Sequence, residues 1–324
     1  MQNVAVLVTS SGVASAVNII KALRLQSDMD VTIVAADMDE MAPGQHLADY
    51  HYIAPSLRRP EDYLDFLAET CRRHEVKAMF PCFSRELSLI SSSREMFRSL
   101  GVDMLVSPPQ TIDLCNDKSR MGEVVERLGI PVPRTFDKPC YSDLPLFSKY
   151  KEGSNSVGAI RIDHRQTLEA AMGAERPRIY QEFVKGVEYT VDILCDQDST
   201  CMVVAPRKRI QTKAGQTVKG VTVVSEVLDQ YSRMICKAVG VVGACNIQFI
   251  EREGTFHFIE LNPRYAAGGL MLTVHAGANI PFLALKMMLE MPICEAELRH
   301  APDIAMTRYW EEIILDGRTC AAVS

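Results

Sequence analysis

The segment NIQFIEREGTFHFIELNPR, residues 246–264, holds two runs of alternating apolar and polar residues separated by Arg-Glu-Gly. Alternation with a period of two predicts β-strands, and Glu253-Gly254 between the runs predicts that they form a hairpin. Glu260 and Asn262 stand two positions apart, so both side chains leave the same face of the second strand. The sequence therefore predicts a pair of polar side chains on one face of a mostly apolar hairpin.

A third polar side chain, Gln248, lies on the first strand and can reach that face if the hairpin closes at its Glu-Gly turn. Two amides and one carboxylate would then converge, a donor set that suits Mg²⁺, with Mn²⁺ as the alternative ion. The other interpretation is a buried, hydrogen-bonded polar cluster without a metal. We favour the metal site, because Glu260 and Asn262 are costly to bury in an apolar strand without a partner.

The first hundred residues alternate short β-branched runs with amphipathic stretches. This order is typical of a parallel, doubly wound sheet, and the nearly continuous apolar character of the strands fits burial on both faces. Ser-Pro-Pro at 107–109 predicts the end of the unit, so we place the first domain boundary near residue 110. The predicted elements are strands at 4–9, 31–37, 77–83 and 103–107 and helices at 14–25, 60–74 and 86–100.

Beyond this boundary the pattern becomes that of an α+β protein. A helix over 113–128 is stopped by Gly129 and followed by a rigid Ile-Pro-Val-Pro connector. A compact module follows, then two strands and a charged stretch at 206–220. The remaining predicted elements are strands near 145–149 and at 159–162, 178–184, 188–195 and 201–206, and helices at about 165–173, 228–240 and 281–290.

The composition excludes several classes of protein. The chain has 324 residues, of which 47% are hydrophobic and 23% charged, so long disordered segments are not expected. A net charge of −6 without a dense Lys/Arg run argues against nucleic acid as the main partner. Because no apolar stretch approaches the about 20 residues of a membrane span and the amino terminus forms no secretory signal, we expect a cytoplasmic protein with no membrane partner.

The ten cysteines include no CxxC pair, which gives a zinc ribbon or a thioredoxin-type motif no support. Most of them stand among apolar neighbours, where a thiol serves as a small core residue. The opening turn, Ser10-Ser11-Gly12 followed by Asp37 at the end of the second strand, resembles a dinucleotide fingerprint but lacks the GxGxxG spacing. We expect a plain strand-to-helix turn there, at the edge where a substrate cleft could lie.

A Gly/Ser-rich segment, FSKYKEGSNSVGAI at 147–160, lies between two predicted strands. Its backbone N–H groups could bind phosphate oxygens, and Lys149 at the end of the preceding strand could supply the positive charge. An ordinary polar hairpin is an equally good interpretation of this segment alone. The residues in question are Lys149, Lys151, Gly153, Ser154, Ser156 and Gly158.

A further candidate is the strand end Gln181-Glu182-Phe183-Val184, followed by Glu188. An extended strand could offer the carbonyl of Glu182 and the N–H of Val184 to the edge of an adenine, and Glu188 could accept both ribose hydroxyls. A solvated edge strand is the alternative.

Taken together, these segments resemble the ATP-grasp superfamily, specifically single-module relatives of the carbamoyl phosphate synthetase large subunit. FIELNPR is close to the family's metal-binding signature, and matching residues run from about 113 to 290. The resemblance implies an α/β fold in which a doubly wound parallel-sheet domain, 1–112, precedes a two-lobed α+β ATP-grasp domain, 113–316. Its lid subdomain would span about 132–184, and 317–324 would be an unstructured tail.

The resemblance also implies roles for individual residues. Lys118 and Lys149 would contact the phosphates of ATP, with the loop 153–158 closing over them. Arg264 and Arg209 would steady the transferred phosphoryl group. The base and sugar would be held by Glu182, Phe183, Val184 and Glu188, and the magnesium ions by Gln248, Glu260 and Asn262.

The sequence departs from the family pattern at two positions of the phosphate clamp. Tyr150 stands where the family often has proline, and Val157 replaces a common lysine or glycine. The details of phosphate binding therefore depend on how this chain accommodates a tyrosine beside the loop.

We therefore expect an ADP-forming ligase that activates a small-molecule carboxylate as an acyl phosphate and joins it to an amine. The alternatives are a carbamoyl phosphate synthetase-like enzyme that phosphorylates bicarbonate or carbamate, a regulatory nucleotide-binding module without turnover, and an oxidoreductase supported by residues 4–37 alone. By family resemblance a homodimer is a further expectation.

Overall fold

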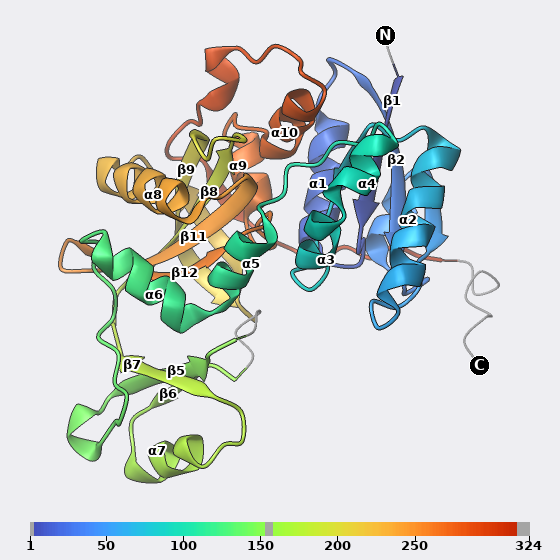
Figure 1. Cartoon of the computed structure of the whole chain (residues 1–324). Coiled ribbons are helices and arrows are strands. Elements are labelled where there is room, and N and C mark those ends of the chain that lie inside the picture. The colour runs from blue at the N-terminus through green and yellow to red at the C-terminus, as the bar shows by residue number, and fades with distance from the viewer. Residues whose placement is uncertain (1–2, 153–157, 316–324) are drawn as a thin grey trace.

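The computed structural model describes residues 3–152 and 158–315, which form three β-sheets with helices packed around them (Figure 1). The first sheet is entirely parallel, in the order β3-β2-β1-β4. This confirms the doubly wound amino-terminal unit. Its strands are β1 (Asn3–Thr9), β2 (Asp30–Asp37), β3 (Tyr50–Ile53) and β4 (Ala78–Phe80), and its helices are α1 (Ala14–Leu25), α2 (Pro60–His74), α3 (Leu87–Ser92) and α4 (Arg94–Ser99).

Three details of this unit differ from the prediction. The edge strand β3 was missed, because its sequence YHYI is short and half polar. The helix predicted over 86–100 is broken at Ser93, whose hydroxyl donates to the carbonyl of Leu89 and competes with the helical ladder. The segment 103–107 is no strand, since it forms isolated bridges to Ala78 and Gly243 and so divides its bonds between two sheets.

A six-stranded sheet in the order β12-β11-β8-β9-β10-β13 forms the centre of the second unit, and its neighbouring strands are antiparallel. Successive residues of β8 face opposite sides, so that Ile193 packs with α8 and Leu194 with α10. The strands are β8 (Val187–Cys195), β9 (Cys201–Lys213), β10 (Gln216–Thr222), β11 (Gly243–Arg252), β12 (Thr255–Asn262) and β13 (Ala305–Thr307), and the helices are α8 (Glu226–Val239), α9 (Leu270–His275) and α10 (Ile280–Met288).

The charged stretch at 206–220 belongs to this sheet. It forms the long β9–β10 hairpin, which turns at Ala214-Gly215, both with positive φ. Charge did not prevent strand formation because Arg207 pairs with buried Asp192 at 2.9 Å and Arg209 faces a cavity described below. The predicted strand at 201–206 was therefore too short.

The helix predicted over 113–128 is two helices, α5 (Pro109–Asn116) and α6 (Lys118–Arg127). They meet at Asp117, which has an extended backbone and whose carboxylate accepts hydrogen bonds from the N–H groups of Ser119 and Arg120. The side chain is an N-cap for α6, and this capping interaction explains the break.

A smaller lobe carries the three-stranded sheet β6-β5-β7, with one helix against it. It projects from the rest of the molecule, below β11 and β12 in Figure 1. Its elements are β5 (Leu146–Tyr150), β6 (Ile160–Ile162), α7 (Arg165–Met172) and β7 (Arg178–Glu182), close to their predicted bounds. The division of the chain at 112/113 and the lid at about 132–184 remain predictions, and the tail 317–324 lies outside the described residues.

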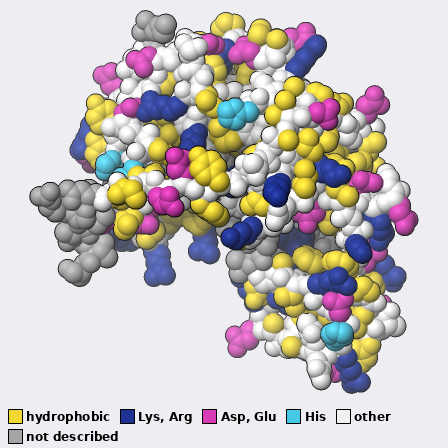
Figure 2. Space-filling model, turned by 180° about the vertical axis from the view of Figure 1, so that it is seen from behind, with side chains coloured by type: hydrophobic (Ala, Val, Ile, Leu, Met, Phe, Trp, Pro, Cys, Tyr) yellow, Lys and Arg dark blue, Asp and Glu magenta, His cyan; other side chains and the backbone are white. Residues whose placement is uncertain are grey.

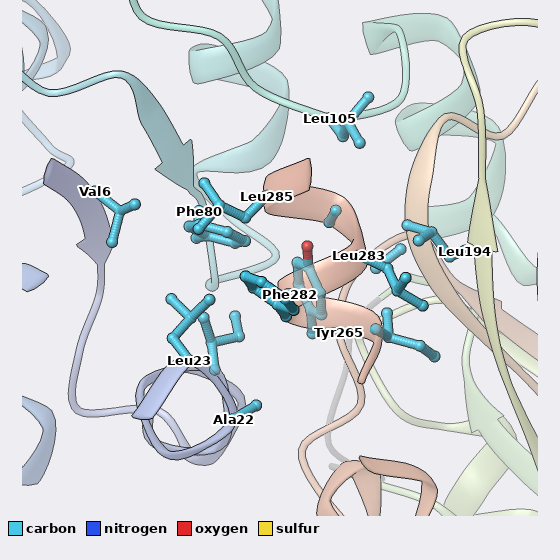
Figure 3. Close-up of a cluster of buried hydrophobic side chains, with 14 of the residues drawn as sticks. Val6, Ala22, Leu23, Phe80, Leu105, Leu194, Tyr265, Phe282, Leu283 and Leu285 are labelled. Atoms are coloured by element: carbon cyan, nitrogen blue, oxygen red, sulfur yellow. The ribbon is translucent and has the colours of Figure 1, made fainter. Parts of the chain in front are cut away.

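One hydrophobic core joins the first sheet to the large sheet. Helix α10 places Phe282 and Leu283 between Phe80 of β4 and Leu194 of β8, and α1 adds Leu23 (Figure 3). The two sheets are therefore packed through shared side chains. Among the helices of the described ranges, none combines the length and the apolar character that a bilayer crossing needs.

Candidate active site

The β11–β12 hairpin brings Gln248, Glu260 and Asn262 to one face. Gln248 pairs directly with Glu260, and the amide of Asn262 donates to the Glu260 carboxylate at 3.0 Å. All three residues line one cavity. The predicted donor set is thus assembled, and its chemistry of one carboxylate and two amides fits a hard divalent cation.

A one-residue bulge in β12 creates this register. From the turn at Glu253-Gly254 a regular hairpin would place Gln248 opposite Ile259, with its side chain on the other face from Glu260. The register shifts between Gln248 and Phe249, which leaves Ile259 as the extra residue. The hairpin closes at the predicted turn and Gln248 reaches the predicted face, but only because of this bulge.

Lys149 of β5 lies against this bulge. Its ammonium donates to the carbonyl of Ile259 at 3.1 Å, and the side chain is only 7% exposed. A buried ammonium is costly unless it has oxygen partners. The smaller lobe therefore contacts the hairpin through a cation at the point where the strand is distorted.

The charges of this cluster stabilise one another. Burial would raise the pKa of Glu260, but Lys149, the amide of Asn262, Lys118 and Arg264 outweigh it, and the pKa lies below its ordinary value. Burial lowers the pKa of Lys149 to about 8, against the opposing effect of Glu260. Burial also lowers the pKa of Lys118. Glu260 is therefore anionic at neutral pH and available as a metal ligand.

Arg264 follows the hairpin and crosses to the amino-terminal unit. Its guanidinium donates to the hydroxyl of Ser84 at 2.8 Å and to the carbonyl of Tyr265 at 3.2 Å. The loop that carries Ser84 is ordered by buried Glu86, whose carboxylate accepts from the N–H of Cys82 at 2.8 Å. A side chain 180 positions away in the sequence thus orients Arg264.

Arg209 of β9 approaches from the other side of the site. Its guanidinium donates to the side-chain oxygen of Gln248 at 3.2 Å and pairs with the carboxylate of Glu188 at 3.1 Å. Its Nε is buried and, among the residues that the structure describes, has no hydrogen-bond partner. This orphaned donor at the site fits the binding of an anionic oxygen.

Two cavities meet at these residues. One, of about 440 Å³, lies between the large sheet and the smaller lobe; the other, of about 460 Å³, lies between the large sheet and the amino-terminal unit. Lys and Arg side chains border the hollow between the lobe and the body (Figure 2). The residues that line both cavities are Arg209, Gly215, Gln248 and Glu260.

The residues expected to hold the base and sugar line the first cavity. Glu182, Phe183, Val184 and Glu188 all contribute to its wall, together with Lys118 and Lys149. The Glu182 carboxylate accepts from the N–H of Arg134 at 3.3 Å, and Glu188 is paired with Arg209. To bind the ribose as expected, the Glu188 carboxylate would have to bind the ribose hydroxyls in addition to Arg209 or in place of it.

The phosphate loop is only partly described. Gly153, Ser154 and Ser156, and also Val157, lie outside the described residues. Gly158 has a φ of 72°, and a Cβ there would clash with the ring of Tyr150. The tyrosine that departs from the family pattern therefore stands directly against the loop's last glycine.

Three further residues at the site were missed by the sequence analysis. Asn246 of β11 pairs with Asn262 and donates to the carbonyl of Arg264 at 3.0 Å, and its place two positions before Gln248 was a usable signal. Ser84 and Ser15 line the second cavity. No local pattern distinguishes these serines from the other serines of the chain, so only the tertiary structure identifies them.

The amino-terminal turn is a plain strand-to-helix connection. The Asp37 carboxylate accepts from the N–H of Gly12 at 2.7 Å, and a Cβ on Gly12 would lie 3.1 Å from the same carboxylate. This N–H group is therefore already bonded within the chain. The following residues, Val13 to Ser15, line the second cavity, so the turn borders the cleft as expected.

Two family models match the chain. Residues 174–312 match "ATP-grasp in the biosynthetic pathway with Ter operon", and residues 6–105 match "PylC-like, N-terminal domain". Among curated proteins, the carbamoyl phosphate synthase large chain of Methanothrix thermoacetophila is 24% identical over 304 residues, which cover 85% of this chain and 28% of that protein. The chain thus spans less than a third of the length of this relative.

Solved structures share the fold at low sequence identity. An L-amino acid ligase from Bacillus licheniformis has a TM-score of 0.66 and 18% identity, covering 93% of this chain and 78% of that one. The biotin carboxylase domain of Hydrogenobacter thermophilus 2-oxoglutarate carboxylase, solved with MgADP and bicarbonate, has a TM-score of 0.67 and 16% identity, covering 91% of this chain and 72% of that one.

Proposed function

The chain belongs to the ATP-grasp family, and on this premise we propose that it is an ATP- and Mg²⁺-dependent ligase that joins a small-molecule carboxylate to an amine. The carboxylate would attack the γ-phosphorus of ATP to give an acyl phosphate and ADP. The amine would then attack the acyl carbon, with phosphate as the leaving group and one proton released. The L-amino acid ligase that shares this fold suggests amino acids as the first substrates to test.

The observation that carries this proposal is the shared wall of the two cavities. A nucleotide in the first cavity would point its phosphates toward Lys118 and Lys149, and a second substrate could enter from the amino-terminal unit. Transfer would then take place across Gln248, Glu260 and Arg209, which border both spaces. The arrangement places donor and acceptor on opposite sides of one set of charged groups.

Gln248, Glu260 and Asn262 would hold the magnesium. The ion neutralises charge that develops on the transferred phosphoryl group. Arg209 and Arg264 would steady the same group through guanidinium N–H donors, which match phosphate oxygens. Glu182, Phe183 and Val184 would hold the base, and Glu188 the ribose. No nucleophilic side chain is required for this chemistry.

Hydroxylamine trapping tests the proposal. With ATP, Mg²⁺ and a panel of carboxylic acids, ADP release should require the correct acid, and hydroxylamine should convert its acyl phosphate to a hydroxamate. In the Arg264→Lys variant, kcat should fall by a larger factor than the KM for ATP rises, because the contact of Arg264 with the transferred phosphoryl group strengthens in the transition state. Arg127→Lys, at an exposed position on α6, is the control. A turned-over acid that gives no hydroxamate would contradict the proposal.

A carbamoyl phosphate synthetase-like reaction is the second candidate, supported by the curated relatives. It predicts ADP release with bicarbonate alone and phosphoryl transfer from carbamoyl phosphate to ADP in the reverse direction. The ligase predicts neither reaction, so the two assays distinguish the candidates.

A further inference from the structure

Four cysteines converge at the end of the large sheet, beneath α8. Cys195 ends β8, Cys201 begins β9, Cys245 lies on β11 and Cys236 lies on α8. All four are buried, and none lines either cavity of the candidate active site. They form a group of thiols that the proposed ligase chemistry does not use.

Three of the sulfur atoms lie at metal-site distances, and the fourth, that of Cys245, contacts one of them. The Sγ atoms of Cys195 and Cys201 are 3.6 Å apart, and those of Cys236 and Cys245 are 3.7 Å apart. Those of Cys195, Cys201 and Cys236 all lie within 4.8 Å of one another. Zinc bound tetrahedrally to sulfur at about 2.3 Å places neighbouring sulfurs about 3.8 Å apart.

A strand irregularity directs one of these thiols into the group. Leu194 pairs with Val203, and continuing that register would place Cys195 opposite Met202, with Cys201 on the other face. The register shifts there, and Cys195 pairs with Cys201 instead. Bulges of this kind re-aim side chains. Both thiols then share the face that α8 covers.

From this convergence we infer that Cys195, Cys201, Cys236 and Cys245 form a mononuclear zinc site. Cys195, Cys201 and Cys236 would supply three ligands, and Cys245, beside Cys236, would supply the fourth. Four sulfur ligands would leave no open position on the ion, which is the arrangement of structural zinc. Binding would displace one proton from each thiol and leave a net charge of −2. The site would tie α8 to three neighbouring strands.

A positively charged side chain of α8 lies next to these thiols. Arg233 of α8 donates to the carbonyl of Cys201 at 2.7 Å and is held by Asp229 at 2.7 Å. Cys71, Cys82 and Cys115 are buried too, but among the described residues thiol–thiol contacts are found only in the group of four.

Metal analysis of the whole protein tests the inference. Protein purified under reducing conditions should contain about one zinc per chain, which an organomercurial that titrates thiols should release. Cobalt substitution should give the absorption of tetrahedral Co²⁺ thiolate, and X-ray absorption should show sulfur ligands at about 2.3 Å. These measurements use the parent protein, so they test the inference even if a cysteine variant does not fold.

Paired variants locate the metal. Cys195→Ser and Cys236→Ser should each lower the zinc content at least several-fold, whereas Cys115→Ser, a buried cysteine in the same hydrophobic core, should retain it. Parent protein that contains no zinc would overturn the inference. This holds both if a thiol titration of the unfolded protein finds all cysteines free and if it finds some of them joined in disulfides. Equal zinc in all three variants would overturn it too. The readout is metal content, so it is independent of ligase activity.

Discussion

At the scale of single residues, the candidate active site depends on opposite charges placed where water is scarce. Glu260 keeps its negative charge because Lys149 and the amide of Asn262 outweigh the cost of its burial. Burial in turn lowers the pKa of Lys149 to about 8. Each of these groups therefore determines the charge state of the other, and both should be sensitive to substitution and to pH.

Glu260→Gln should lower kcat by more than about 100-fold while the fold is retained. It removes the only anionic oxygen of the predicted magnesium ligands, and substitutions even of outer partners of metal ligands cost about 10–100-fold. ADP release at varied Mg²⁺ and circular dichroism would measure the two effects. Glu253→Gln, the same change in the exposed hairpin turn, is the control. Parental kcat with normal Mg²⁺ dependence would exclude the metal assignment.

The kcat/KM for ATP should fall as the pH rises above about 8, because Lys149 then loses the charge expected to bind phosphate. In the Lys149→Gln variant kcat/KM should be low and this limb should be absent. Between about 8 and the ordinary value of 10.5, the unfolded chain holds more protons at this position, so the contribution of Lys149 to stability rises with pH. Deprotonation of Lys149 therefore does not destabilise the fold, and unfolding does not explain the fall in kcat/KM. A parental profile that is flat through pH 8 would contradict the role of Lys149.

At the scale of elements, local irregularities determine where side chains point. The extra residue Ile259 places Glu260 opposite Gln248 and turns its own carbonyl toward Lys149. The break at Asp117 separates α5 from α6 and sets Lys118 at the first turn of a capped helix. Neither feature follows from a regular strand or helix pattern, because each depends on one residue that leaves the repeat.

Asp117→Ala should lower the free energy of unfolding by about 1 kcal/mol, since it leaves the first N–H groups of α6 without their cap. Asp117→Asn should lose much less, because asparagine is an equally good N-cap. Urea denaturation of the two variants measures the difference. Equal losses would mean that the ion pair of Asp117 with Lys151, 3.3 Å apart, provides the stability instead of the cap.

At the scale of the whole molecule, a single core links the two larger sheets. Phe282 of α10 packs between the amino-terminal unit and the large sheet (Figure 3). Arg264 reaches Ser84 across the same boundary. The second cavity is lined from both sides of this boundary. The relative position of the two units therefore determines the shape of the proposed acceptor site.

Phe282→Ala should lower the free energy of unfolding by about 3–5 kcal/mol, as for other buried aromatic truncations. Because the core is shared, hydrogen exchange should become faster in both β1 and β9. Ile314→Ala, at a position 88% exposed, is the control and should change neither. Faster exchange confined to one of the two strands would show that the units unfold separately.

The sequence by itself determined most of the strands and helices, the hairpin at Glu253-Gly254 and the identities of the polar residues in FIELNPR. These features are local, because hydrophobic periodicity and turn residues act over a few positions. The tertiary structure alone decided the bulge at Ile259, the contact of Ser84 with Arg264 and the meeting of four cysteines separated by up to 50 positions in sequence. Such contacts arise from packing between distant elements, which no local pattern encodes.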